Sequence, residues 1–83
     1  MAEVPLTAVQ SAMLDVERRG WRDRFAKEQA IRDRFGWSPT QYYEALNRLI
    51  DEPAAWAAEP LVVKRLRRRR ARRRAAAAAD RPA

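Results

Sequence analysis

The sequence predicts a small all-α protein: a helical bundle that contains a helix-turn-helix, with a long arginine-rich C-terminal helix that projects from the body. Apolar residues recur at helical spacing in successive segments that start with capping residues. Between two of these segments, Phe35-Gly36-Trp37-Ser38 supplies the apolar residues, glycine and polar cap of a helix-turn-helix. After Leu66 the large apolar residues stop and a run of arginines follows.

The first helix is predicted at about residues 8–19, with an extension through Trp21 as the alternative. Thr7 and Gln10 form a capping box, in which each side chain bonds the backbone N–H of the other residue. Gly20 follows two arginines and fits the position just after a helix end, where a left-handed glycine is common. The predicted apolar face consists of Val9, Ala12, Met13 and Val16.

The second helix is predicted at about residues 26–35, and its inward residues are Ala30, Ile31 and Phe35. Residues 21–25 fit either a loop or a continuation of the first helix. Trp21 and Phe25 are four residues apart, which allows them to share a face. Gly36 ends the second helix, and residues 36–38 form the predicted turn.

The third helix is predicted at about residues 39–51. Ser38 and Gln41 form a second capping box, Pro39 fits the first helical position, and Pro53 ends the segment. On a helical wheel the inward side consists of Tyr42, Ala45, Leu46, Leu49 and Ile50. In a helix-turn-helix this would be the recognition helix.

The remaining chain is predicted to hold a short element at residues 53–58 and a final helix from Pro60. We expect Trp56 to pack onto the core, as Trp21 and Trp37 also would. The final helix is expected to leave the body after about two turns, and its distal part to fray alone because its like charges repel. The chain thus divides into a helix-turn-helix body, 1–60, and a basic helix and tail, 61–83. The residues expected to dock the final helix are Leu61, Val62, Val63 and Leu66.

Charge is distributed unevenly along the chain. Residues 1–60 hold eight Lys/Arg and ten Asp/Glu, a net of −2, whereas residues 61–83 hold ten Lys/Arg and one Asp, a net of +9. Such a cationic segment indicates a polyanionic partner, with nucleic acid favoured over an anionic membrane because no apolar face accompanies the arginines. If six to nine cations displace counterions, the slope of log K against log salt is about −5 to −8.

Enzymatic chemistry is not expected. The chain has no Cys and no His, and shows no P-loop or metal-ligand spacing, so we expect no cofactor and no bound metal. No apolar run approaches the length of a membrane-spanning helix, and the N-terminus lacks signal-peptide features. We therefore expect a cytoplasmic protein located at the nucleoid.

Candidate DNA-binding residues lie on the third helix and in the arginine run. Asn47 and Gln41 can pair with adenine, and Arg48 with guanine or phosphate. Thr40 and Ser38 suit phosphate near the helix N-terminus, and Tyr43 suits phosphate or a thymine methyl group. The Glu44 carboxylate could accept a hydrogen bond from cytosine or repel phosphate. The candidate phosphate contacts are Lys64, Arg65, Arg67, Arg68, Arg69, Arg70, Arg72, Arg73 and Arg74.

The chain also resembles a family of small actinobacterial proteins known as domain of unknown function 3263. The resemblance implies a helix-turn-helix fold and an actinobacterial or actinophage source, but it brings no target. The sequence departs from the family pattern at Phe25 and near Gly20-Trp21. The resembling residues include Leu14-Asp-Val-Glu17, Ala26-Lys-Glu-Gln-Ala-Ile-Arg32, Phe35-Gly36, Ser38, Tyr42-Tyr43, Leu46-Asn47, Leu49-Ile-Asp51, Pro53, and Pro60 through Val63-Lys-Arg-Leu-Arg-Arg68.

Together these features favour a double-stranded-DNA-binding protein, either a transcription regulator or a nucleoid-associated architectural factor. Two alternatives remain. One is a protein-interaction module, for example a phage-encoded partner of RNA polymerase. The other is an RNA binder that uses the arginine-rich helix.

Overall fold

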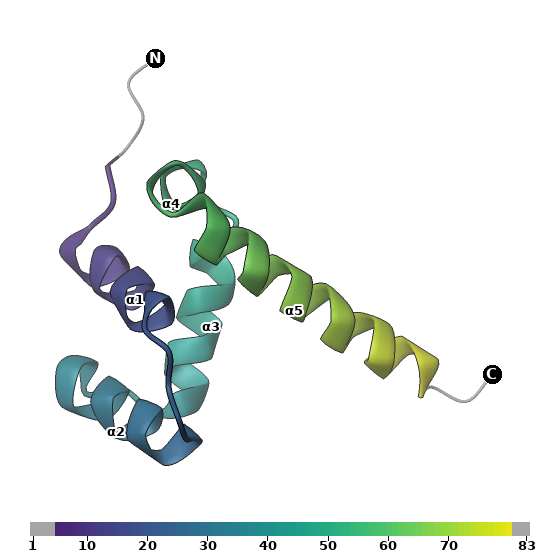
Figure 1. The fold of residues 1–83 in the computed structure, drawn as a ribbon, viewed down its shortest axis with the longest axis horizontal. Coiled ribbons are helices and arrows are strands. Elements are labelled where there is room, and N and C mark those ends of the chain that lie inside the picture. The colour runs from purple at the N-terminus through teal and green to yellow at the C-terminus, as the bar shows by residue number, and fades with distance from the viewer. Residues whose placement is uncertain (1–4, 81–83) are drawn as a thin grey trace.

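The computed structural model describes residues 5–80, and these residues form helices without a strand. The predicted all-α bundle with a projecting final helix is therefore confirmed (Figure 1). The ends of the predicted lead-in and tail, residues 1–4 and 81–83, lie outside the described residues. The helices are α1 (Ala8–Arg18), α2 (Arg24–Phe35), α3 (Pro39–Leu49), α4 (Pro53–Ala58) and α5 (Pro60–Ala79).

Helix α1 begins with the predicted capping box between Thr7 and Gln10, but it ends differently from the prediction. The helix stops at Arg18, Arg19 is extended, and Gly20 does not adopt a left-handed conformation. Side chains from outside the helix satisfy two of the last carbonyls instead. Trp21 Nε1 donates to the Val16 carbonyl at 2.8 Å, and Arg65 Nη2 donates to the Glu17 carbonyl at 2.5 Å. A glycine cap is unnecessary where such donors are present.

Helix α2 starts two residues earlier than predicted because Asp23 caps it. The Asp23 side chain accepts a hydrogen bond from the Ala26 backbone N–H at 2.8 Å. Residues 21–23 are therefore loop, and Phe25 belongs to the helix. Trp21 is half-buried whereas Phe25 is 82% exposed, so these two rings do not share a buried face.

The α2–turn–α3 unit follows the local sequence signals closely. Gly36 takes a left-handed conformation with φ 70°, and its N–H donates to the Arg32 carbonyl at 2.8 Å. Ser38 and Gln41 form the predicted capping box, with Pro39 in the first turn. Helix α3 ends at Leu49 rather than at residue 51, because tight i→i+3 hydrogen bonds at Asp51 and Glu52 turn the chain toward α4.

The apolar core lies where α1, α3 and α5 meet. Three apolar predictions are wrong. Val9 is 45% exposed in the first turn of α1, and Leu14 is buried in its place. Leu61 is 80% exposed, and Trp56 is 42% exposed because the buried face of the short α4 centres on Ala55. The core consists of Met13, Leu14, Val16, Ile31, Tyr42, Leu46, Leu49, Ile50, Ala55, Val62, Val63 and Leu66.

A polar cluster connects α1, α2 and α3 inside this core. Glu17 is 3% exposed, and its carboxylate accepts from the Tyr42 hydroxyl at 2.5 Å and from Lys27 Nζ at 3.0 Å. Burial, followed by the neighbouring Glu17 carboxylate, raises the pKa of Tyr42 well above its usual value. The cluster fixes the three helices in one arrangement, since each buried polar group needs its partner.

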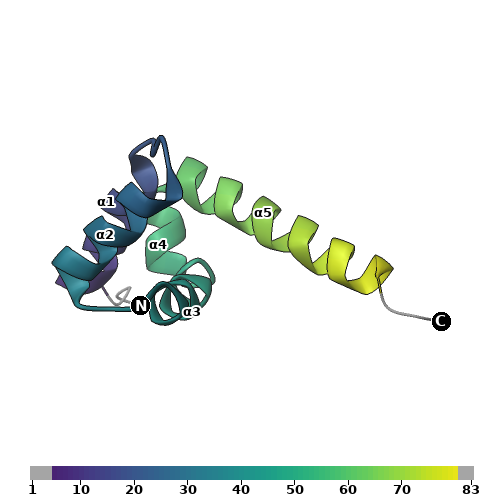
Figure 2. The same cartoon turned by 90° about the horizontal axis from the view of Figure 1, so that it is seen from below.

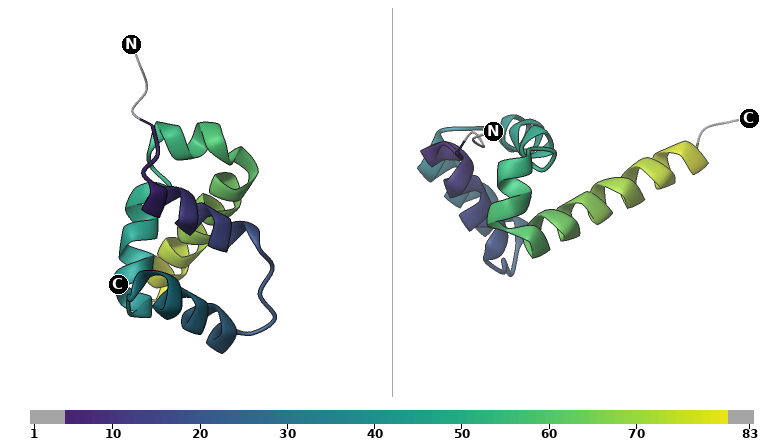
Figure 3. Two further views of the ribbon diagram at one scale, coloured as in Figure 1. Left: turned by 90° about the vertical axis from the view of Figure 1, so that its left-hand side faces the viewer. Right: turned by 90° about the horizontal axis from the view of Figure 1, so that it is seen from above.

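Helix α5 leaves the body from the corner formed by α4 (Figures 1 and 2). Seen from above, α4 leads into α5, which extends away from α1, α2 and α3 (Figure 3). Its docking continues one turn beyond Leu66, because Arg70 is only 12% exposed and bonds to Asp51 and to the Asn47 carbonyl. The helix extends to Ala79, where alanines have high helix propensity. Fraying of this part in solution stays a prediction.

Candidate nucleic-acid interface

A groove of about 550 Å³ lies between α3 and the projecting part of α5. One wall carries Thr40, Tyr43, Glu44 and Asn47 from α3, and the other carries Arg69 and Arg73 from α5. Arg24 and Glu28 of α2 also line it. The structure therefore brings together part of the predicted recognition helix and part of the arginine run.

Ser38 and Gln41 are engaged in the helix cap. Gln41 Oε1 accepts from the Ser38 backbone N–H at 2.9 Å, and Ser38 Oγ accepts from the Gln41 backbone N–H at 3.2 Å. Bidentate adenine pairing needs the same Gln41 oxygen as acceptor for the adenine amino group. The cap uses one of the two lone pairs of this oxygen and restrains the direction in which the side chain can present the other.

The other α3 candidates separate onto two sides of the helix. Thr40 and Asn47 are exposed and line the groove. Tyr43 is half-buried there, with Lys27 Nζ 5.2 Å from the centroid of its ring. Arg48 lies on the α1 side, beside a separate cavity that Gln10 and Met13 also line. Arg48 and Asn47 therefore do not face one groove.

Three members of the arginine run are used to build the body. Arg65 caps the end of α1, as described above. The guanidinium of Arg67 lies 5.4 Å from the ring centroid of Trp56. Arg70 binds both carboxylate oxygens of Asp51, at 2.7 and 3.0 Å, and these bonds hold the pKa of Asp51 below its usual value.

The other cations of the run have no hydrogen-bond or ion-pair partner among residues 5–80. Arg69 and Arg73 are four residues apart, so they lie on one face of α5, and both line the groove. The remaining four are exposed. The set of unpaired cations is Lys64, Arg68, Arg69, Arg72, Arg73 and Arg74.

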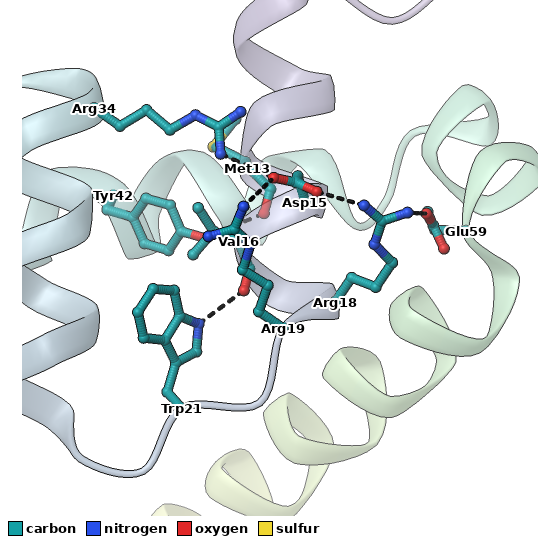
Figure 4. A network of polar contacts seen from close by, with 9 residues as sticks. All are labelled: Met13, Asp15, Val16, Arg18, Arg19, Trp21, Arg34, Tyr42 and Glu59. Atoms are coloured by element: carbon teal, nitrogen blue, oxygen red, sulfur yellow. Dashed lines mark hydrogen bonds and ion pairs between the residues drawn. The ribbon is translucent and has the colours of Figure 1, made fainter.

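Other cations of the body are already neutralised around Asp15 (Figure 4). Arg18 Nη2 and Arg34 Nη1 contact its carboxylate at 2.5 and 3.0 Å, and Arg18 Nη1 also lies 3.7 Å from Glu59 Oε1. The hydrogen bonds from Arg34 and Arg18 hold the pKa of Asp15 below its usual value. These contacts join α1 to α2 and to the start of α5.

Sequence reasoning missed the basic side chains near the α1–α2 connection. Arg22 lies in the connection, and Arg24 and Lys27 lie in the first turns of α2. All three line a cavity with Arg65 and Arg69 of α5. Their spacing in the sequence matches no binding motif. Only the packing of α5 against the connection brings the two groups together.

The fold and this surface define a small all-α protein with a basic helix beside an open groove. The chain belongs to the family described as protein of unknown function (DUF3263), whose profile matches residues 5–78. Comparison with curated proteins and with solved structures finds no match. Among the helices described, none has both the length and the apolar character needed to cross a membrane.

Proposed function

We propose that the protein binds double-stranded DNA, with the α2–turn–α3 unit as a helix-turn-helix and α5 as a phosphate-binding arm. The observation that carries this proposal is the division of the arginine run. Arg65, Arg67 and Arg70 hold α5 in place, while six cations of the same helix have no partner in the described body. A positioned helix with unpaired cations suits a phosphate backbone.

The number of unpaired cations sets the strength of the electrostatic contribution. If all six contact phosphates, the slope of log K against log salt is about −5. This value is at the shallow end of the range expected from the whole run, because the paired arginines release no counterions from DNA when they keep their partners in the body.

Direct reading of bases is expected to be weak. Of the α3 candidates, Thr40 and Asn47 are exposed in the groove, while Gln41 is engaged in its cap. Glu28 and Glu44 line the same groove and oppose phosphate there. We therefore propose that α3 sets the position of the protein on DNA and adds a modest sequence preference, as in a nucleoid-associated factor or a regulator with limited specificity.

Binding of a random-sequence duplex, followed by fluorescence anisotropy at several salt concentrations, tests the proposal. A chain that ends at Arg70 keeps every contact that docks α5 but lacks Arg72, Arg73 and Arg74. Its slope should be shallower by about 2.7. A matched chain that ends at Arg74 should retain the full slope. Weak duplex binding by the complete chain at low salt would overturn the proposal.

A second candidate is a protein-interaction module on the transcription machinery. The chain exposes two large apolar side chains that a protein partner would cover, Phe25 at 82% and Leu61 at 80% exposure. Pull-down with and without nuclease separates the two functions, since a partner that is lost after nuclease treatment is bridged by DNA. Competition between duplex DNA and structured RNA tests the RNA-binding alternative.

A further inference from the structure

A second basic site lies at the α1–α2 connection, in a cavity of about 460 Å³. Its walls come from residues 19–24, from α2, from Tyr43 of α3 and from α5. Cationic side chains from three of these segments line one space. They are Arg19, Arg22, Arg24, Lys27, Arg65 and Arg69.

The two acidic residues that line the cavity are already engaged. Glu17 is buried, and its carboxylate binds Lys27 Nζ and the Tyr42 hydroxyl. Asp23 Oδ1 accepts from the Ala26 backbone N–H as the cap of α2. Within the cavity, Glu17 neutralises Lys27, whereas the Asp23 carboxylate keeps its negative charge while it caps α2. Six cations thus face one neutralised and one charged carboxylate.

The arginines themselves are weakly paired or unpaired. Among residues 5–80, Arg22 and Arg69 have no ion-pair partner. Arg65 donates to a backbone carbonyl, which carries no formal charge. Arg24 Nε lies 3.6 Å from Glu28 Oε1, and Arg19 Nη2 lies 3.7 Å from Asp15 Oδ2, so neither pair has hydrogen-bond geometry of good quality. Like charges gathered in this way repel one another unless an anion joins them.

We propose that this cavity binds a phosphate group. Guanidinium groups present paired N–H donors that match phosphate oxygens, and the volume lies within the range of small-molecule sites. The phosphate has two possible sources, a nucleic-acid backbone or a free phosphorylated molecule. The cavity shares Arg24, Tyr43 and Arg69 with the α3–α5 groove, so DNA lying in the groove would reach it. For the DNA source the inference rests on the proposed function.

The test uses the full chain labelled with nitrogen-15 and titrated with pyrophosphate at low salt. The backbone N–H of Gly20 and the indole N–H of Trp21 report on the cavity, because both residues line it. Arg22→Gln removes a cation of the cavity, and Arg32→Gln removes an exposed cation of α2 that does not line it. Loss of a charged hydrogen-bond donor should weaken binding about tenfold in Arg22→Gln, and Arg32→Gln should bind as the parent does.

A second titration with a short DNA duplex identifies the source of the phosphate. Saturable shifts of both resonances with pyrophosphate, sensitive to Arg22→Gln, establish a site for a free phosphorylated molecule. Shifts with duplex alone, and a salt slope that is shallower by about 0.9 in Arg22→Gln but not in Arg32→Gln, establish a backbone site.

The proposed site is wrong if neither probe shifts the two resonances, or if both variants bind both probes equally. Duplex binding that is insensitive to Arg22→Gln, without pyrophosphate binding, defeats this inference and leaves the proposed function intact. Pyrophosphate binding without duplex binding defeats the proposed function and leaves this inference intact. Arg22 is exposed, and a well-dispersed spectrum of each variant verifies that it is folded.

Discussion

Arg70 and Arg73 lie three residues apart on α5 but have different surroundings, and replacing each by Gln should have different effects. Arg70 is 12% exposed and bonds to Asp51 and the Asn47 carbonyl. Arg73 is exposed, lines the groove, and has no ion-pair partner in the described part of the chain. Each substitution removes one positive charge from the same helix, so the two variants are matched in net charge.

The expected magnitude comes from counterion release. Each phosphate contact contributes about 0.9 to the slope of log K against log salt, so Arg73→Gln should make the slope shallower by about 0.9. Arg70→Gln should leave the slope unchanged, because Arg70 keeps its bonds to the body when DNA binds. The free energy of unfolding should fall in Arg70→Gln and stay unchanged in Arg73→Gln. Arg70→Gln breaks two hydrogen bonds to Asp51 and one to the Asn47 carbonyl of α3, and Arg73→Gln breaks none within residues 5–80.

Fluorescence anisotropy with one duplex over a series of salt concentrations measures the slope, and urea denaturation followed by circular dichroism measures the midpoint. The double variant Asp51→Asn/Arg70→Gln keeps the net charge and shows whether a liberated Asp51 repels DNA. Equal reductions of the slope in Arg70→Gln and Arg73→Gln would refute the division of the run into docking and binding arginines. So would an unchanged urea midpoint in Arg70→Gln.

Three further predictions concern the body. Glu17→Ala leaves Lys27 and the Tyr42 hydroxyl without their buried partner. In urea denaturation it should lower the free energy of unfolding by about 3–5 kcal/mol. The control Glu44→Ala, at an exposed position, should change it by less than about 0.5 kcal/mol. The pKa of Asp15 is lowered in the folded state, so its contribution to stability is complete above the unfolded pKa of about 3.9 and is lost as pH falls through the folded value. Urea midpoints measured at decreasing acidic pH should therefore fall less steeply in Asp15→Asn than in the parent. Gly36→Ala should cost about 1–2 kcal/mol because φ is 70°. Gly20→Ala should be nearly neutral, because this position has no positive φ and an added Cβ would meet open space. Equal costs would contradict the assignment of Gly36 as the left-handed cap.

The sequence predicts the parts of this fold that depend on neighbouring residues. Both capping boxes and the Gly36 turn are local, because each bond joins residues three or four positions apart. The end of α1 is different. Besides the nearby Trp21, it depends on Arg65, which is 48 positions from the carbonyl that it binds, and no local pattern contains that second contact. The glycine rule therefore fails at Gly20 and holds at Gly36.

The candidate interface also has features that the sequence predicts and features that depend on tertiary contacts. Composition alone locates the positive charge in the final helix, and helical spacing places Arg69 and Arg73 on one face. Which arginines dock α5 depends on the positions of the Glu17 carbonyl, Trp56 and Asp51, and these are tertiary features. Trp56 illustrates the same limit, because its ring lies beside Arg67 at the surface although its size favours a core position.

The anchoring of α5 at Arg70 also gives the protein a fixed reach. Beyond that residue the cations extend to Arg74, four positions further along the helix, which is about 6 Å at 1.5 Å per residue. Base pairs in B-form DNA are stacked about 3.4 Å apart, so these cations span about two of them. A duplex held at α3 would thus be contacted a second time at a distance set by the helix. Insertion or deletion of residues after Arg74 would leave that distance unchanged, whereas insertion or deletion before Arg72 would alter it.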